Sequence, residues 1–227
     1  MLLPGWLNMR SLTGFFLLIN CPLASAAIQL QQTRLIYPAG EPSIALAIKN
    51  SDSTQAVAIN SWVESDRQDI HVLPAREIIE PGGEGKLNIS IPDDGKGRYR
   101  ERLYWLNVKA TPVAKSAAPL ALTVINRMKI FYRPKHLLSG ANSAYRKLTI
   151  AGCSKELIIK NPTPYYISFY SLKIDEQEIK DVRMIAPYES VVVSQAAGTR
   201  HTRVHWQAIL DTGLHSPILA KKNSSGC

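Results

Sequence analysis

Apolar and polar residues alternate over much of the chain, and three segments show this most clearly. The residues on one side of these segments are Ile44, Leu46 and Ile48; Leu87, Ile89 and Ile91; and Leu120, Leu122 and Val124. A period of two with β-branched residues is typical of half-buried β-strands. No stretch of twelve residues keeps the 3.6-residue period of an amphipathic helix, so alternating β–α units are not expected.

Clusters of turn-forming residues separate the predicted strands. The clusters are Pro38-Ala39-Gly40, Asn50-Ser51-Asp52-Ser53, Pro81-Gly82-Gly83, Pro92-Asp93-Asp94-Gly95 and Asn161-Pro162-Thr163-Pro164. Where they are closely spaced, their interval of about ten to fifteen residues favours antiparallel β-sandwiches. The sequence therefore predicts an all-β protein.

The first 26 residues are predicted to be a cleavable secretory signal peptide. Arg10 is their only charged residue, residues 12–23 are mostly apolar, and the segment ends in the small-x-small pattern Ala24-Ser25-Ala26. A single membrane anchor is the alternative, but an apolar core of about 11 residues is too short to span ~30 Å of hydrocarbon. The roughly 200 residues that remain are twice the ~100 of one immunoglobulin-like sandwich, so two sandwiches in tandem are predicted.

The boundary between the two domains is expected shortly after a strand over residues 122–132. Arg133-Pro134-Lys135 ends that strand, because proline cannot continue a central strand. A new strand is predicted to begin near Leu148. The predicted domains are therefore residues 27–136 and 137–227.

Composition and charge narrow the possible functions. The 227 residues are 45% hydrophobic and 20% charged, which is ordinary for a globular protein, and the formal net charge is +9. The basic residues do not form long runs, so an exported protein with a basic surface is favoured over a nucleic-acid-binding protein. No multi-span membrane protein is expected, because there is no apolar run of about 18 residues or more.

Two cysteines remain once Cys21 is removed with the signal peptide. In an oxidising compartment, Cys153 and Cys227 are predicted to form a disulfide. It closes a loop of roughly 75 residues, for which chain entropy gives an upper figure of about 4–5 kcal/mol. Two unpaired thiols are the alternative.

Motifs that carry catalysis are missing from the sequence. Neither G-x-S-x-G nor H-E-x-x-H occurs, and residues 82–86 depart from a phosphate-binding loop, so a hairpin turn is favoured there. His201, His205 and His215 are interpreted as exposed histidines rather than zinc ligands. We expect no enzyme activity, no metal and no cofactor.

Two cations occupy strand-like, apolar surroundings. Arg34 lies in Thr33-Arg34-Leu35-Ile36-Tyr37, and Lys129 lies in Met128-Lys129-Ile130-Phe131-Tyr132. An unpaired buried cation costs several kcal/mol. The two side chains therefore either reach water or meet an anion.

Four motifs together resemble the periplasmic pilus chaperones of the chaperone–usher pathway, the PapD-like family. They are residues 33–40, 100–108 (Arg-Glu-Arg-Leu-Tyr-Trp-Leu-Asn-Val), 127–134 (Arg-Met-Lys-Ile-Phe-Tyr-Arg-Pro) and 161–166 (Asn-Pro-Thr-Pro-Tyr-Tyr), in the family's order. The resemblance covers essentially the whole chain after the signal peptide. It implies two immunoglobulin-like domains in an L shape and a periplasmic chaperone that binds and caps pilus subunits and delivers them to an outer-membrane usher.

The resemblance also implies roles for individual residues. Arg34 and Lys129 correspond to the family's anchor for the C-terminal carboxylate of a subunit. Leu120, Leu122 and Val124 correspond to the strand that the chaperone lends to the subunit, although alternating apolar residues are also what a domain's own core contains. Glu101, Arg133 and Asp211 correspond to an ionic triad between the domains. Asp211 matches least well, because the residues around it depart from the family pattern.

Two other classes of protein stay open at this point. An exported immunoglobulin-like pilus or adhesin subunit is the first alternative. Only about six residues precede the first motif after the predicted cleavage site, which disfavours the N-terminal donor extension that such subunits usually carry. A periplasmic hydrolase is the second alternative, and the missing nucleophile motif disfavours it.

Overall fold

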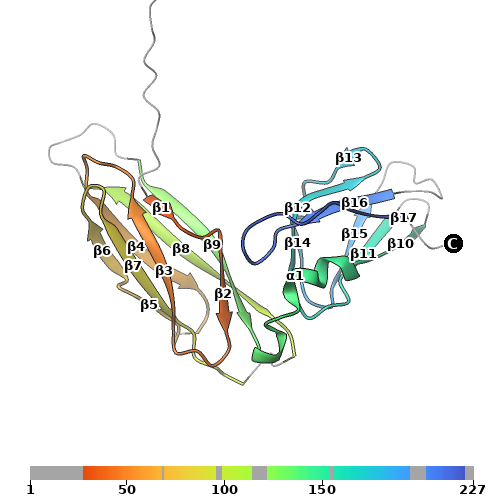
Figure 1. Ribbon diagram of the computed structural model, residues 1–227, viewed down its shortest axis with the longest axis horizontal. Helices are drawn as coiled ribbons and strands as arrows, with labels where there is room; N and C mark the ends of the chain where they lie inside the picture. The colour runs from red at the N-terminus through yellow and green to blue at the C-terminus, as the bar shows by residue number, and fades with distance from the viewer. Residues whose placement is uncertain are drawn as a thin grey trace, which may run out of the picture.

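A computed structural model describes residues 28–67, 69–95, 99–113, 122–153, 156–194 and 203–222. Almost all regular elements are β-strands, arranged as two β-sandwiches that meet at an angle, as Figure 1 shows. The prediction of two immunoglobulin-like sandwiches in an L shape is confirmed. Within the described residues, no helix has the length and apolar character needed to cross a membrane.

The first sandwich consists of a four-stranded sheet, β1-β3-β7-β5, and a five-stranded sheet, β2-β9-β8-β4-β6. Its strands are β1 (Ile28–Leu30), β2 (Arg34–Pro38), β3 (Ile44–Asn50), β4 (Val57–Glu64), β5 (His71–Leu73), β6 (Arg76–Ile79), β7 (Glu84–Ser90), β8 (Arg102–Pro112) and β9 (Val124–Arg133). Leu46, Leu87, Ile89, Leu106 and Ile130 lie in the core between the sheets. The alternation in β3 and β7 thus gives half-buried strands, as predicted.

The strands β1 and β2 belong to different sheets, although only residues 31–33 separate them. β1 pairs antiparallel with β3, and β2 pairs parallel with β9. Among the residues that the structure describes, this pairing covers residues 129–133 of β9 and leaves residues 124–128 paired only with β8. The first half of β9 is therefore an open edge of the five-stranded sheet.

The second sandwich has a three-stranded sheet, β10-β11-β15, and a sheet of order β13-β12-β16-β17, with β14 paired to β12. Its strands are β10 (Thr149–Cys153), β11 (Glu156–Lys160), β12 (Ile167–Ile174), β13 (Gln177–Glu178), β14 (Met184–Ile185), β15 (Ser190–Ser194), β16 (Arg203–Ala208) and β17 (Leu219–Lys222). A separate core surrounds Trp206, which is 1% exposed and donates from Nε1 to the carbonyl of Tyr145 at 3.1 Å.

Short helices connect the two sandwiches. Pro134 follows β9, and the chain then forms η1 (Lys135–Leu137), α1 (Ala141–Ala144) and η2 (Tyr145–Lys147) before β10 begins. Each of these is a single turn, too short to produce a helical period in the sequence. The predicted division at residues 136 and 137 falls inside η1.

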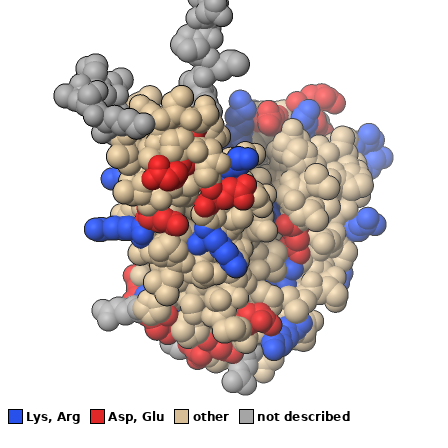
Figure 2. Space-filling model, turned by 60° about the vertical axis from the view of Figure 1, so that its left-hand side comes forward, with Lys and Arg blue, Asp and Glu red and all other residues tan. Residues whose placement is uncertain are grey.

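Charged side chains of both signs are mixed on the face of the protein drawn in Figure 2. On the face drawn in Figure 2, acidic and basic residues alternate instead of forming one basic field. This distribution agrees with the interpretation of the basic residues as a dispersed surface charge.

Candidate functional site

Arg34 and Lys129 are neighbours on adjacent strands. They are Cα partners in the parallel pairing of β2 with β9, which places them at the point where the open edge of β9 ends. Arg34 is 9% exposed, and Lys129 is partly buried. The sequence marked both residues as unusual cations, and the structure brings them together.

Both side chains reach toward the second domain. Arg34 donates from Nη1 to the carbonyl of Ile209 at 2.9 Å, and its guanidinium lies 5.5 Å from the ring centroid of Phe131. Nζ of Lys129 is 3.3 Å from Oγ of Ser168. Nothing in the sequence indicates these partners, because they lie 175 and 39 positions away along the chain.

Neither cation forms an ion pair within the described part of the chain. No carboxylate of the described residues lies within salt-bridge distance of Arg34 or Lys129, and Nε of Arg34 is buried without a hydrogen-bond acceptor. Burial, and after it the nearby charges of Arg34 and Arg183, lower the pKa of Lys129 to about 8. Burial also lowers the pKa of Arg34. The site therefore favours an added negative charge.

A hollow of about 420 Å³ lies next to Arg34, between residues 31–36 and the loop of residues 211–214. The loop approaches the first domain closely at Gly213, whose φ is +83°. A Cβ atom there would lie 2.6 Å from Oγ1 of Thr33. A residue without a side chain is therefore required at this contact.

Arg133 connects the two domains through two carboxylates. Its Nε lies 2.6 Å from Oε1 of Glu101, and its Nη1 and Nη2 lie 2.6 and 2.8 Å from the oxygens of Asp211. Arg133 and Glu101 are each 2% exposed, whereas Asp211 is partly exposed. The three residues of the predicted triad are thus in contact, Asp211 included.

The Asn-Pro-Thr-Pro-Tyr-Tyr motif provides backbone contacts at the same junction. The carbonyl of Pro164 accepts from the N–H of Glu101 at 2.9 Å, and the N–H of Tyr166 donates to Oε2 of Glu101 at 2.7 Å. Asn161 holds the turn by donating to the carbonyl of Tyr165 at 2.7 Å. The buried carboxylate of Glu101 is therefore fully bonded, which a buried charge requires.

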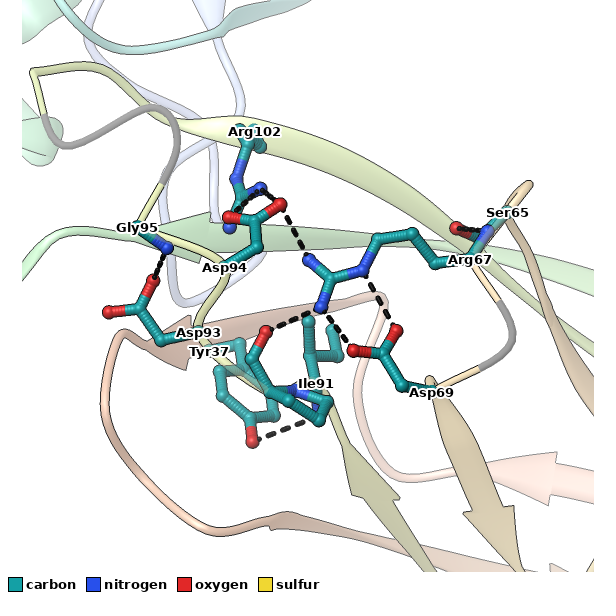
Figure 3. A network of polar contacts seen from close by, with 10 residues as sticks. Tyr37, Ser65, Arg67, Asp69, Ile91, Asp93, Asp94, Gly95 and Arg102 are labelled. Atoms are coloured by element: carbon teal, nitrogen blue, oxygen red, sulfur yellow. Dashed lines mark hydrogen bonds and ion pairs between the residues drawn. The ribbon is translucent and has the colours of Figure 1, made fainter.

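A charged network that the sequence did not indicate supports the start of β8. Figure 3 shows Arg67 between Asp69, at 2.6 Å, and Asp94, at 2.8 Å, with Arg102 also 2.8 Å from Asp94. The guanidinium of Arg102 lies 4.5 Å from the ring centroid of Tyr132. The network connects the loops after β4 and β7 to the residue that follows Glu101.

The predicted lent strand extends from the residues before β9 to its first residue, Val124. Leu122 is 72% exposed and Val124 is 42% exposed, and neither belongs to the hydrophobic cores. The expectation that they are half-buried within their own domain is wrong, because both residues lie before the part of β9 that pairs with β2 and contributes to the core. Leu120 lies outside the described residues.

Other predicted sites are only partly described. Cys227 and the side chain of Cys153 lie outside the described part of the chain, and so does His201. His215 is exposed and stacks on Tyr170, with ring centroids 3.4 Å apart. Among the described residues, no group of three His, Cys, Asp or Glu side chains is arranged to hold a metal ion.

Two family models match the chain. The model described as "Pili and flagellar-assembly chaperone, PapD N-terminal domain" matches residues 27–138, and "Pili assembly chaperone PapD, C-terminal domain" matches residues 143–219. The chain belongs to this family of PapD-type pilus assembly chaperones. It is therefore a chaperone of pilus assembly, and the alternative of a structural pilus subunit is not favoured.

Individual relatives agree with the family of PapD-type chaperones. The chaperone protein FocC of Escherichia coli is 29% identical over 211 residues, which are 89% of this chain and 92% of FocC. The CupB2 chaperone of Pseudomonas aeruginosa has a TM-score of 0.72 at 27% identity, covering 86% of this chain and 100% of that structure. The periplasmic chaperone SfaE has a TM-score of 0.70 at 27% identity, covering 84% of this chain and 96% of that structure.

Proposed function

We propose that this chaperone works in the periplasm, where it binds pilus subunits, lends them its β9 strand and delivers them to an outer-membrane usher. One observation carries the proposal. Arg34 and Lys129, two adjacent cations that form no ion pair with any described residue, lie at the end of an open strand edge. Membership of the PapD family and the similarity to the periplasmic chaperone SfaE support it.

Arg34 and Lys129 anchor the C-terminal carboxylate of the subunit. Each hydrogen bond between a charged donor and a carboxylate contributes about 1.5–3 kcal/mol. Partial burial strengthens this attraction, because the cations have already lost much of their water. A carboxylate also gives Nε of Arg34 the acceptor that it otherwise lacks.

The geometry of β9 supports one direction for the added strand. A strand that pairs with residues 124–128 of β9 and ends at Lys129 runs parallel to β9, in line with β2. Backbone hydrogen bonds along this edge give affinity, and the position of the anchor sets the register. The last residue of the subunit then lies against Arg34.

Leu120, Leu122 and Val124 are the side chains that enter the open groove of the subunit. By the alternation of a strand, they point to the same side as Met128, which is buried in the domain's own core. Leu122 and Val124 are nevertheless exposed, because the core does not extend to them. Burial of each aliphatic side chain contributes roughly 1.5–3 kcal/mol.

The remaining predicted residues have structural roles. Glu101, Arg133 and Asp211 fix the angle between the domains, and a Cys153–Cys227 disulfide closes the second domain. The signal peptide of residues 1–26 directs export. Neither catalysis nor a cofactor is part of this function.

The anchor is tested with a pair of synthetic peptides. Both contain about ten alternating Val and Thr residues behind solubilising lysines, and they differ only in a free or an amidated C-terminus. The wild-type protein is expected to bind the free acid more tightly, and Arg34→Ala and Lys129→Ala are expected to lose the difference while keeping the wild-type circular dichroism. Lys160→Ala, on the exposed face of β11, is the control. Equal affinity of the wild-type protein for acid and amide contradicts the proposal.

A further inference from the structure

An exposed aromatic side chain stands out on the second domain. The pairing of β12 with β16 passes from Phe169–Ala208 to Ser171–Gln207, so Tyr170 is an extra residue in β12. Such a bulge turns a side chain out of the regular alternation of a strand. Tyr170 is 56% exposed and belongs to neither hydrophobic core.

The ring of Tyr170 is held in place by His215. The two ring centroids are 3.4 Å apart, and the rings are nearly parallel, at 20°. His215 is also exposed, and it forms an antiparallel bridge with Ile209, directly after β16. Tyr170 and His215 therefore form a ring pair that is open to solvent and attached to the sheet.

Tyr170 lies a short distance along β12 from the contact with Lys129. Ser168, two positions earlier, is the residue whose Oγ lies 3.3 Å from Nζ of Lys129. Two residues of a strand span about 7 Å. The backbone also connects the two strands at this point, because the N–H of Ile209 donates to the carbonyl of Ser168 at 2.9 Å.

His215 lies beside the contact with Arg34. The carbonyl of Ile209, its bridge partner, accepts from Nη1 of Arg34 at 2.9 Å. Leu214, the residue before His215, is 68% exposed and lines the hollow of about 420 Å³ next to Arg34. In Figure 1, the loop between β16 and β17, which contains both residues, lies on the side of the second sandwich that faces β2.

We propose that Tyr170, His215 and Leu214 form a second contact surface of the subunit-binding cleft and pack against apolar side chains of the pilus subunit beside its C-terminal end. The inference rests on the proposed function, because it places the end of the subunit at Arg34 and Lys129. A subunit whose last strand ends there brings the residues around that end within reach of the ring pair. This continuity with the anchor favours the subunit as the partner over a second copy of the chaperone.

The ring pair is well suited to such a contact. A tyrosine buries a large area with few rotatable bonds, and tyrosines are enriched among the residues that dominate binding. Because His215 already orients the ring, little further conformational freedom is lost on binding. Burial of the exposed Leu214 adds apolar contact. Loss of Tyr170 is therefore expected to weaken subunit binding about tenfold.

Site-specific crosslinking tests where the subunit lies. The tagged, full-length protein with Tyr170→p-benzoylphenylalanine is purified from periplasm with its bound subunit, irradiated and analysed by mass spectrometry. A covalent one-to-one adduct with a protein identified as a pilus subunit is expected. Val192→p-benzoylphenylalanine is the control and should give no such adduct, because Val192 is equally accessible, at 55% exposed, but lies on β15 in the other sheet.

Alanine variants test whether the contact contributes to affinity. The purified complex is diluted into an excess of untagged wild-type chaperone, and the rate at which the subunit leaves the tagged protein is measured. Tyr170→Ala is expected to release the subunit about tenfold faster than the wild-type protein, and Val192→Ala at the wild-type rate. Tyr170→Ala should still prefer the free-acid peptide described above over the amidated one, which shows that the variant folds and keeps its anchor.

The outcomes separate this inference from the proposed function. If the wild-type protein prefers the free acid, but the probe at Tyr170 gives no adduct or an adduct with a second copy of the chaperone, the inference is wrong and the anchor stands. An unchanged rate of release from Tyr170→Ala also overturns it. If the wild-type protein binds acid and amide equally, or no subunit copurifies with it, the proposed function fails and the inference fails with it.

Discussion

At the scale of single residues, Lys129 is the group whose charge depends most on its surroundings. Its folded-state pKa of about 8 lies below its ordinary value of 10.5. Folding therefore disfavours the charged form of Lys129. The resulting loss of stability is largest below about pH 8 and disappears as the pH rises from about 8 to 10.5. A bound carboxylate favours the charged form, so binding above pH 8 requires the uptake of a proton.

Affinity for the free-acid peptide is expected to fall about tenfold between pH 7 and pH 9. The amidated peptide, which lacks the terminal charge, is expected to show little change. Titration calorimetry in two buffers of different ionisation enthalpy measures the proton uptake directly. A binding enthalpy that is independent of the buffer at about pH 8.5 contradicts the assignment of Lys129 to the anchor.

A second prediction concerns the contact between Gly213 and Thr33. Gly213→Ala is expected to destabilise the protein by about 1–2 kcal/mol, because its φ of +83° strains any residue with a Cβ and the new atom meets Thr33. Thr33→Ala relieves the collision but not the backbone strain. In urea unfolding, the double variant should therefore lose less stability than the two single variants added together. If the stability losses of the two single variants add exactly in the double variant, the contact between Gly213 and Thr33 is absent in solution.

The residue scale also shows what sequence alone reveals of the site. Arg34 and Lys129 stand out because a cation in an apolar strand needs an explanation. Ser168 does not stand out, because it is an ordinary polar residue until the second domain folds against the first. Charge and local hydrophobicity identify the buried cations, but only the tertiary structure shows which residues of the second domain they contact.

At the scale of elements, the alternating pattern predicts strands but not their partners. The period of two identified β3 and β7, yet nothing in it indicates that β2 pairs parallel with β9 and stops at Lys129. For the same reason it assigned Leu122 and Val124 to a half-buried strand. Their exposure follows from their position before the part of β9 that pairs with β2, which is a property of the sheet.

The open edge of β9 leads to a third prediction. Leu122→Glu and Val124→Glu should leave the melting of the isolated chaperone almost unchanged, within about 0.5 kcal/mol, because both residues are exposed. They should abolish capture of the subunit that copurifies with the tagged protein from periplasm, because the Glu would be buried without a counter-ion. Thr123→Glu, of opposite parity, is the control and should retain capture. A large drop in melting temperature would instead show that Leu122 and Val124 stabilise their own domain.

At the scale of the whole molecule, two separate cores are held together mainly by polar contacts. Arg133 with its two carboxylates, the bond from Arg34 to Ile209 and the backbone bond from Glu101 to Pro164 cross the junction. The aromatic contribution is Phe131 against Tyr166, with ring centroids 5.8 Å apart. The angle between the domains, and so the position of Ser168 relative to Lys129, depends on a few directional bonds.

Arg133→Gln is therefore expected to affect the arrangement of the domains as well as stability. The variant leaves the buried carboxylate of Glu101 without its cation, which costs about 3–5 kcal/mol when one partner of a buried pair is removed. Calorimetry should then resolve two unfolding transitions, and small-angle X-ray scattering should show a wider range of shapes. Arg127→Gln, which breaks the exposed pair with Glu64, is the matched control and should cost at most about 1 kcal/mol. If both variants lose the same small amount and unfold in one transition, the angle is set by packing and not by the triad.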